Sequence, residues 1–256
     1  MIGNQIQSGK GASMDENPYY LVYEERYRKV YEAGAERWGH AENDSGLRAS
    51  LTEWVNLHNL RGKRIVEFAC GEGASGVILS QLGCLYRGVD IAPSAVAKAK
   101  AALADYPGAQ VTLLDMVREQ VEGTFDAALD VMGLHMLVVD ADRAGYLRNV
   151  RSCLRIGAPL LLFRESYREN ADDRPVESFQ SWLELTGDDY RTPQTRYAGP
   201  ADAQVEVRIP LVPARAKTEA GYRKELQEAG FTVDRFVPMM ADMQIVSSAS
   251  IYAHKP

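Results

Sequence analysis

The sequence predicts an α/β protein: a three-layer, doubly wound, seven-stranded and mostly parallel sheet. From about residue 63 onward, short apolar runs alternate with helical patterns at close spacing. This alternation is typical of parallel strands joined by helices that cover both faces of a sheet. The chain ends in two apolar runs, 231–238 and 245–253, with no helical pattern between them. They predict a closing hairpin, whose last strand is antiparallel.

Length and composition restrict the class of protein. The 256 residues fit one large domain, or one domain with an insertion, and 46% of them are hydrophobic. A net charge of −6 argues against tight nucleic-acid binding, and no apolar run approaches the roughly 18 residues of a membrane span. The three cysteines show neither a close pair nor metal-ligand spacing. We therefore expect a cytoplasmic monomer or homodimer with no metal, nucleic-acid partner or membrane partner.

The first 62 residues precede the alternating pattern. Residues 1–16 are rich in Gly, Ser and Gln, and we expect a disordered leader there. Residues 17–62 predict a helical lead-in, with helices over 19–37 and 45–60. Ser45 is the expected N-cap of the second helix, and Gly62 its end. Along the first helix, four tyrosines share one face, which either packs on the sheet or lines a site: Tyr19, Tyr23, Tyr27 and Tyr31.

Residues 63–165 predict the core of the sheet. Its strands are expected at 64–68, 85–90, 110–114, 125–132 and 158–163. Helices are expected between them, at 75–82, at 93–103 with Pro93 in the first turn, and from Asp140 to Gly157 with Asp140 as the N-cap. Residues 218–256 complete the core, with a helix capped by Thr218 and ended by Gly230.

Residues 166–217 interrupt the alternation of strand and helix patterns and predict an insertion. The segment is polar, contains prolines and several aromatic residues, and closes with a strand-like run at 204–211. Ligands of parallel sheets bind beyond the carboxyl ends of the strands, where this insertion begins. It therefore predicts a substrate lid, although aromatic residues are also enriched at oligomer contacts.

A glycine-rich turn follows the first predicted strand. Residues 71–76 read Gly-Glu-Gly-Ala-Ser-Gly, a G-x-G-x-x-G pattern that opens a helix. Glycines allow a sharp turn and a close approach of a ligand to the main chain, and the helix N-terminus offers free N–H groups. The same pattern also fits a tight turn without a ligand. Asp90 ends the next strand, 17 residues after Gly73, where a carboxylate either binds ribose hydroxyls or caps a helix.

Four landmarks in this order resemble the class I S-adenosylmethionine-dependent methyltransferases of small-molecule type. They are Glu67 with the glycine-rich loop, Asp90, Asp115 followed by Met116, and the segment 125–131. The resemblance implies S-adenosylmethionine as the cofactor, with Asp90 on the ribose and Asp115 and Met116 on the adenine. The cofactor-binding residues that it implies are Tyr27, Trp38, Glu67, Ala69, Gly71, Gly73, Asp90, Ile91, Asp115, Met116, Asp130 and Val131.

Ala69 departs from this family pattern, which has a glycine at the first position of the loop. Alanine resists a positive φ because of its Cβ atom. We expect an ordinary backbone at Ala69, and hence a tolerated change.

Other functions fit some of these residues. A nicotinamide-dependent dehydrogenase uses the same glycine pattern and an acid at a strand end, but it has no standard role for Asp115. A non-catalytic regulatory or partner protein with the methyltransferase fold and an aminopropyl transferase also remain alternatives.

The acceptor is best described by exclusion. After the fourth strand, residues 130–133 read Asp-Val-Met-Gly, without the prolines of amino methyltransferases that act on nucleobases or glutamine. No cysteine follows a proline, unlike in cytosine C5 enzymes. We therefore expect a small-molecule O, N or S acceptor. His135 is either its general base or a structural histidine, and the expected substrate-binding residues are Tyr23, His135, Glu165 and Tyr167.

Overall fold

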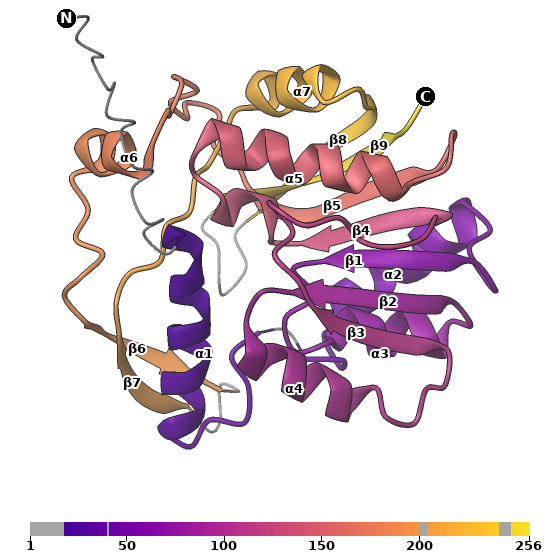
Figure 1. Cartoon of the computed structure of the whole chain (residues 1–256), viewed down its shortest axis with the longest axis horizontal. Helices are drawn as coiled ribbons and strands as arrows, with labels where there is room; N and C mark the ends of the chain where they lie inside the picture. Colours follow the sequence, from indigo (N-terminus) through magenta and orange to yellow (C-terminus); the bar gives the residue numbers. More distant parts are fainter. Residues whose placement is uncertain (1–17, 40, 200–203, 241–246) are drawn as a thin grey trace, which may run out of the picture.

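A computed structural model describes residues 18–39, 41–199, 204–240 and 247–256 of the chain (Figure 1). The expected disordered leader, residues 1–16, lies outside these ranges. The main sheet has seven strands in the order β3-β2-β1-β4-β5-β9-β8. In chain order they are β1 Arg64–Phe68, β2 Leu85–Asp90, β3 Ala109–Leu113, β4 Ala127–Val131, β5 Pro159–Ser166, β8 Thr232–Met240 and β9 Ser247–His254.

The pairing of the strands confirms the predicted fold class. The five strands β1–β5 pair in parallel, whereas β9 pairs antiparallel with both β5 and β8. The last strand of the chain is therefore the reversed one, and β8 forms the edge of the sheet. Because β1 lies in the middle of the five parallel strands, the chain reverses its direction of growth between β1 and β4, which is where open parallel sheets bind ligands.

Helices cover both faces of the sheet because successive strand residues point to opposite sides. Val66 lies in the core with α5 (Asp140–Cys153) and α7 (Glu219–Glu228). Its neighbour Ile65 lies in the other core, with α2 (Ser45–Leu57), α3 (Ala74–Gln81) and α4 (Pro93–Ala102). This alternation makes the three layers, with both faces of the central strands buried.

The lead-in forms η1 (Tyr19–Leu21), α1 (Val22–Glu32) and α2. The predicted end of the first helix was wrong, since α1 ends five residues before Arg37. The predicted N-cap Ser45 was also wrong, because the carboxylate of Asp44 accepts the hydrogen bond from Leu47 N at 2.9 Å. Two adjacent residues of capping type left the sequence ambiguous here.

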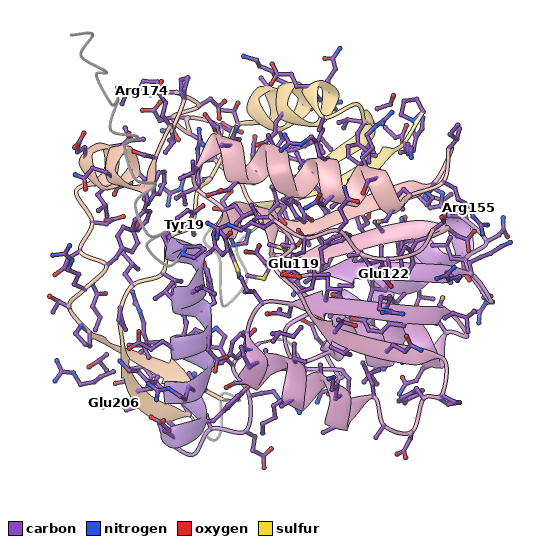
Figure 2. The ribbon with its side chains drawn as sticks, in the orientation of Figure 1. Tyr19, Glu119, Glu122, Arg155, Arg174 and Glu206 are labelled. Carbon is purple, nitrogen blue, oxygen red and sulfur yellow. The ribbon has the colours of Figure 1, made fainter. Side chains whose placement is uncertain are left out.

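The inserted segment contains α6 (Phe179–Thr186) and a separate two-stranded sheet of β6 (Gln194–Ala198) and β7 (Val205–Ile209). This small sheet lies along α1, as Figure 1 shows, and the two share a core of Val30, Ala35, Ala198, Val207 and Ile209. Figure 2 marks Tyr19 at the start of this helical segment and Glu206 beside its far end. Helix α1 of the lead-in and the β6–β7 sheet of the insertion, distant in sequence, thus pack together beside the main sheet.

The ends of two core elements differ from the predictions. Asp140 does not cap α5: Val139 is the N-cap, and the Asp140 carboxylate accepts the N–H of Val176 at 2.9 Å. The helix ends at Cys153 rather than Gly157. Strand β5 continues past Phe163 to Ser166, with a bulge between Leu162 and Glu165.

Candidate active site

A cavity of about 890 Å³ lies at the carboxyl ends of the parallel strands, beneath α1 and the β6–β7 sheet. In Figure 1 the arrowheads of these strands point toward α1. The volume of the cavity lies within the ~300–1,000 Å³ typical of small-molecule sites. The sequence-predicted residues that line it are Tyr23, Tyr27, Trp38, Glu67, Ala69, Gly71, Asp90, Ile91, Asp115, Met116, Val131 and His135. The predicted residues outside its lining are Gly73, Asp130, Glu165 and Tyr167.

The loop after β1 is held in place from both sides. Gly71 has a φ of 51°, and its N–H donates to Asp90 Oδ2 at 2.8 Å. A Cβ atom on Gly71 would lie 3.0 Å from the Tyr27 hydroxyl, so glycine keeps this wall open. Gly73 instead packs against the backbone of Ala99 and allows α3 and α4 to approach each other.

Asp90 is buried at the end of β2, with its carboxylate beside the cavity. One oxygen accepts the Gly71 N–H and the other the Ala92 N–H, at 2.8 and 2.9 Å. Burial raises the pKa of Asp90, and these backbone hydrogen bonds oppose that rise. Asp90 is not the N-cap of α4, which is Ala92. Its fixed carboxylate can still accept hydrogen bonds from a ligand.

Asp115 holds the corresponding place after β3. Its Oδ1 accepts the Val117 N–H at 2.9 Å, and its Oδ2 accepts the Tyr20 hydroxyl at 3.1 Å. Met116 lines the cavity next to it. Sequence reasoning missed Tyr20, although it stands directly beside the tyrosine stripe.

Glu67 is fully buried at the end of β1 and accepts a hydrogen bond from the Tyr86 hydroxyl. Burial raises the pKa of Glu67 to about 8, although hydrogen bonds from Tyr86 and Ser75 act in the opposite direction. At neutral pH this carboxyl group is therefore mostly protonated, unlike an exposed glutamate.

The expectation of an ordinary backbone at Ala69 was wrong. Its φ is 53°, and Met132, at the end of the adjacent strand β4, has a φ of 64°. The chain must turn sharply after β1, while Cys70 N bonds to Val89 O and Gly73 N to Cys70 O, both at 3.0 Å. Gly133 makes room for the Ala69 side chain, since a Cβ atom there would lie 2.7 Å from it. Such a left-handed residue costs about 1–2 kcal/mol.

His135 lies in the short helix η2 (Leu134–Met136), after β4. Its N–H and its Nδ1 both contact Glu165 Oε2, at 2.7 and 2.9 Å. Glu165 is fully buried and lies behind the histidine. Asp130 is also buried away from the cavity, where its carboxylate accepts the Gly133 N–H and the Tyr146 hydroxyl. Of the contacting residues His135 and Glu165, only His135 lines the cavity, and the Glu165 carboxylate lies behind it.

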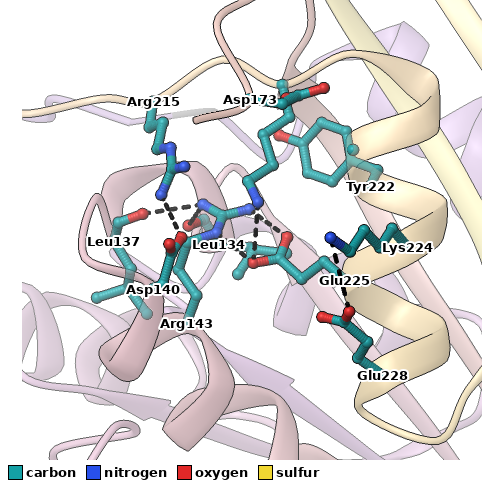
Figure 3. A network of polar contacts seen from close by, with 12 residues as sticks. Leu134, Leu137, Asp140, Arg143, Asp173, Arg215, Tyr222, Lys224, Glu225 and Glu228 are labelled. Atoms are coloured by element: carbon teal, nitrogen blue, oxygen red, sulfur yellow. Dashed lines mark hydrogen bonds and ion pairs between the residues drawn. The ribbon is translucent and has the colours of Figure 1, made fainter. Parts of the chain in front are cut away.

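A buried ionic network holds the backbone around His135 (Figure 3). The Arg143 guanidinium donates to Leu134 O and Leu137 O at 2.8 and 2.9 Å, and it pairs with Glu225 of α7. Arg215 donates its backbone N–H to His135 O at 2.8 Å and its Nη1 to Val138 O at 2.9 Å. Two arginines thus satisfy four of the five backbone carbonyls from Leu134 to Val138, and they fix the position of the histidine.

The tyrosine stripe is divided among several partners. Tyr23 and Tyr27 line the cavity, and the Tyr23 hydroxyl donates to Pro213 O at 2.7 Å. Tyr19 stacks on Phe179 of α6, with ring centroids 4.7 Å apart. Tyr31 donates to Glu72 Oε1 at 2.7 Å. Tyr167 packs on Phe236 instead of facing the cavity.

The Glu72 side chain links the lead-in to the glycine-rich loop after β1 by hydrogen bonds. Its carboxylate accepts the backbone N–H groups of Trp38 and Gly39 at 3.0 and 2.7 Å, as well as the Tyr31 hydroxyl. Sequence reasoning treated Glu72 only as a variable position of the glycine pattern. It therefore missed the contact that places Trp38 beside the cavity.

A family model described as a methyltransferase domain matches residues 66–160. This match supports a class I S-adenosylmethionine-dependent methyltransferase. The matched residues include the loop, Asp90, Asp115 and His135, so the family model covers most of the strand ends of the cavity. No curated protein sequence matches this methyltransferase.

Solved structures share the fold at low sequence identity. A magnesium protoporphyrin IX methyltransferase from Synechocystis with bound S-adenosylhomocysteine is 15% identical, with a TM-score of 0.62 over 93% of this chain and 100% of that one. An S-adenosylmethionine-dependent methyltransferase from Clostridium acetobutylicum is 12% identical, with a TM-score of 0.60 over 92% and 98%. An amino pentose methyltransferase from Micromonospora echinaspora is 18% identical, with a TM-score of 0.59 over 95% and 100%.

Among the described residues of this methyltransferase, no group of three His, Cys, Asp or Glu side chains is placed to hold a metal ion. Within the same residues, no helix combines the length and the apolar character that a membrane span requires.

Proposed function

We propose that this methyltransferase transfers the methyl group of S-adenosylmethionine to an O, N or S atom of a small molecule and releases S-adenosylhomocysteine. The observation that carries the proposal is a single cavity that joins the strand-end carboxylates Asp90 and Asp115 to the imidazole of His135. A cofactor and a small acceptor would therefore share one partly enclosed space.

The residues at the strand ends fit the cofactor. The backbone at Gly71 leaves room for a ligand beside the loop, because no Cβ atom projects there. Asp90 is fixed by two backbone N–H groups and retains lone pairs for the two ribose hydroxyls. Asp115 would accept the adenine amino group, with Met116 against the ring. Tyr27 and Trp38 would close over the cofactor from the lead-in.

Bound S-adenosylmethionine supplies a methyl group that is already activated as a sulfonium. The protein must therefore align the acceptor and exclude water, which the aromatic lead-in and the insertion would do together. For a hydroxyl or amine acceptor, a proton must also leave as the new bond to carbon forms and the bond from carbon to sulfur breaks. His135 would take that proton on Nε2.

The Glu165 carboxylate supports this assignment. It lies 2.9 Å from His135 Nδ1, so a proton on Nδ1 is favoured and Nε2 keeps its lone pair. Nε2 makes no hydrogen bond with the described residues, and His135 lines the cavity. A histidine oriented by a carboxylate in this way suits a general base better than a purely structural role.

Replacement of His135 tests the proposal. With a panel of small phenols, amines and thiols, and mass spectrometry to detect an added methyl group, His135→Ala should lower turnover of an oxygen or nitrogen acceptor by about 100-fold. Its affinity for S-adenosylhomocysteine should be unchanged. His58→Ala, a change at an exposed histidine outside the cavity, is the matched control. Full activity of His135→Ala would contradict the assignment.

We propose a cellular location and partners for the enzyme as well. All three cysteines are unpaired and buried, which supports a reducing, cytoplasmic location. A small-molecule acceptor and a monomer or homodimer are the partners that we propose with it.

A further inference from the structure

Arg26 of α1 lines the cavity, and no described residue accepts a hydrogen bond from its guanidinium. Its guanidinium stacks on the Trp38 ring, 3.8 Å from the centroid. Its Nε atom is buried and has no hydrogen-bond partner, and no ion pair to Arg26 occurs among the described residues. An arginine carries five N–H donors, and leaving them unsatisfied beside apolar rings is costly. The side chain is therefore placed to bind an acceptor that the described residues do not supply.

Arg196 of β6 lines the same cavity from the inserted sheet. Among the described residues, its guanidinium donates one hydrogen bond, to the neutral Gln194 side chain at 3.1 Å. Burial lowers the pKa of Arg26 to about 10, and the positive charge of Arg196, which lines the same cavity, acts in the same direction. Arg26 remains charged at neutral pH. The side of the cavity formed by α1 and β6 is therefore lined by two positive charges.

The acidic side chains of the cavity that the structure describes do not lie in this wall. Glu67, Asp90 and Asp115 stand at the strand ends. Glu72 is occupied by Trp38, Gly39 and Tyr31. The wall formed by α1 and β6 therefore has positive charge, while the opposite side has the acids. An anionic group between Arg26 and Arg196 would satisfy both arginines and remove their repulsion.

We propose that the acceptor molecule carries a carboxylate or a similar acidic group, which Arg26 and Arg196 bind between the lead-in and the inserted sheet. This inference rests on the proposed function, because it names the substrate class of the same site. Trp38 and Tyr197, which line the same wall, would contact the apolar body of the acceptor. The acidic group would then orient the nucleophile toward His135.

The cofactor has a carboxylate of its own, so the experiment must separate the two sources. The protein is first saturated with S-adenosylhomocysteine, which supplies the cofactor carboxylate. Binding of benzoate, phenylacetate, 3-phenylpropanoate and 4-hydroxybenzoate is then measured by calorimetry, each against its neutral amide. The variants are Arg26→Gln and Arg196→Gln, with Arg28→Gln on the exposed side of the same helix as the matched control.

For the best acid, the wild type should bind at least about 10-fold more tightly than the amide, since a hydrogen bond to a charged group contributes about 1.5–3 kcal/mol. Arg26→Gln and Arg196→Gln should remove this preference, and Arg28→Gln should keep it. The affinity for S-adenosylhomocysteine should stay within about 3-fold in all three variants.

Three results would overturn the inference. They are equal binding of every acid and its amide, a preference that survives Arg26→Gln, and a loss of about 10-fold or more in S-adenosylhomocysteine affinity in Arg26→Gln. The last result would assign Arg26 to the cofactor carboxylate. Failure of wild-type protein to bind S-adenosylhomocysteine would instead refute the proposed function itself.

Discussion

The two sides of the cavity are built differently. The floor consists of the strand-end residues Glu67, Ala69, Gly71, Asp90 and Asp115, and the roof consists of α1 with the lining residues of the insertion. Asp90 and Asp115 on the floor are held by backbone N–H groups of their own or the adjacent loop. The roof depends on a few side-chain contacts between distant segments, such as Tyr23 with Pro213. The floor is thus fixed by local backbone contacts, whereas the roof is fixed by contacts between segments that are distant in sequence.

The largest expected effect is on the floor. Asp90→Ala should lower the affinity for S-adenosylhomocysteine by about 100-fold, because two hydroxyl hydrogen bonds to a charged acceptor are lost. The fold should persist, as judged by circular dichroism. Titration calorimetry checks the affinity, with the exposed Asp105→Ala as the control. Unchanged affinity would remove Asp90 from the cofactor site.

Glu67 predicts a pH dependence of stability that originates on the floor. Burial raises the pKa of Glu67 from 4.5 to about 8 in the folded state. Between these values the unfolded chain releases a proton that the folded protein retains, so the free energy of unfolding falls as the pH rises. Each unit of pKa is worth about 1.4 kcal/mol, which makes this contribution a few kcal/mol.

Glu67→Gln should therefore flatten the fall in stability between pH 5 and pH 8. Urea unfolding at both pH values checks this, and the exposed Glu122→Gln should keep the wild-type slope. Identical slopes for Glu67→Gln and the wild type would show that Glu67 is charged in the folded protein.

Tyr23→Phe tests the roof. The change removes the hydrogen bond to Pro213 O, worth about 1 kcal/mol. Hydrogen exchange of the amides around residues 211–217 should accelerate several-fold, whereas exchange in β1 and β4 and the affinity for S-adenosylhomocysteine should not change. Equal acceleration in roof and floor would show that the two sides are not separable.

The smallest effect is expected at Ala69. Ala69→Gly relieves a left-handed alanine worth about 1–2 kcal/mol, but it also increases the entropy of the unfolded chain by about 0.4–1 kcal/mol. The free energy of unfolding, measured in urea, should therefore rise by about 0–1.6 kcal/mol. Ala97→Gly, at an exposed position within α4, should lower it by about the same amount. Equal destabilisation by both changes would mean that Ala69 is not strained.

The floor was more predictable from the sequence than the roof. Glu67, Asp90 and Asp115 each follow or end a strand, so local pattern alone brought them to one edge of the sheet. Tyr23 and Pro213 are 190 residues apart, and no local pattern predicts their contact or the partners of Arg26. The predicted backbone conformation of Ala69 was wrong because hydrogen bonds on both sides of the loop, and not the preference of alanine, determine its φ angle. The binding roles assigned to all these residues stay predictions.

The central claim is that the floor binds S-adenosylmethionine and not a nicotinamide cofactor. Thermal unfolding of the wild-type protein with saturating S-adenosylhomocysteine, compared with NAD⁺ and NADH, tests it most directly. Ligand at about 100 times its Kd stabilises the fold by about 2.7 kcal/mol, which for a chain of this size raises Tm by roughly 5–10 °C. We predict this rise with S-adenosylhomocysteine and no shift with either nicotinamide form. A rise with NAD⁺ or NADH, and none with S-adenosylhomocysteine, would contradict the claim.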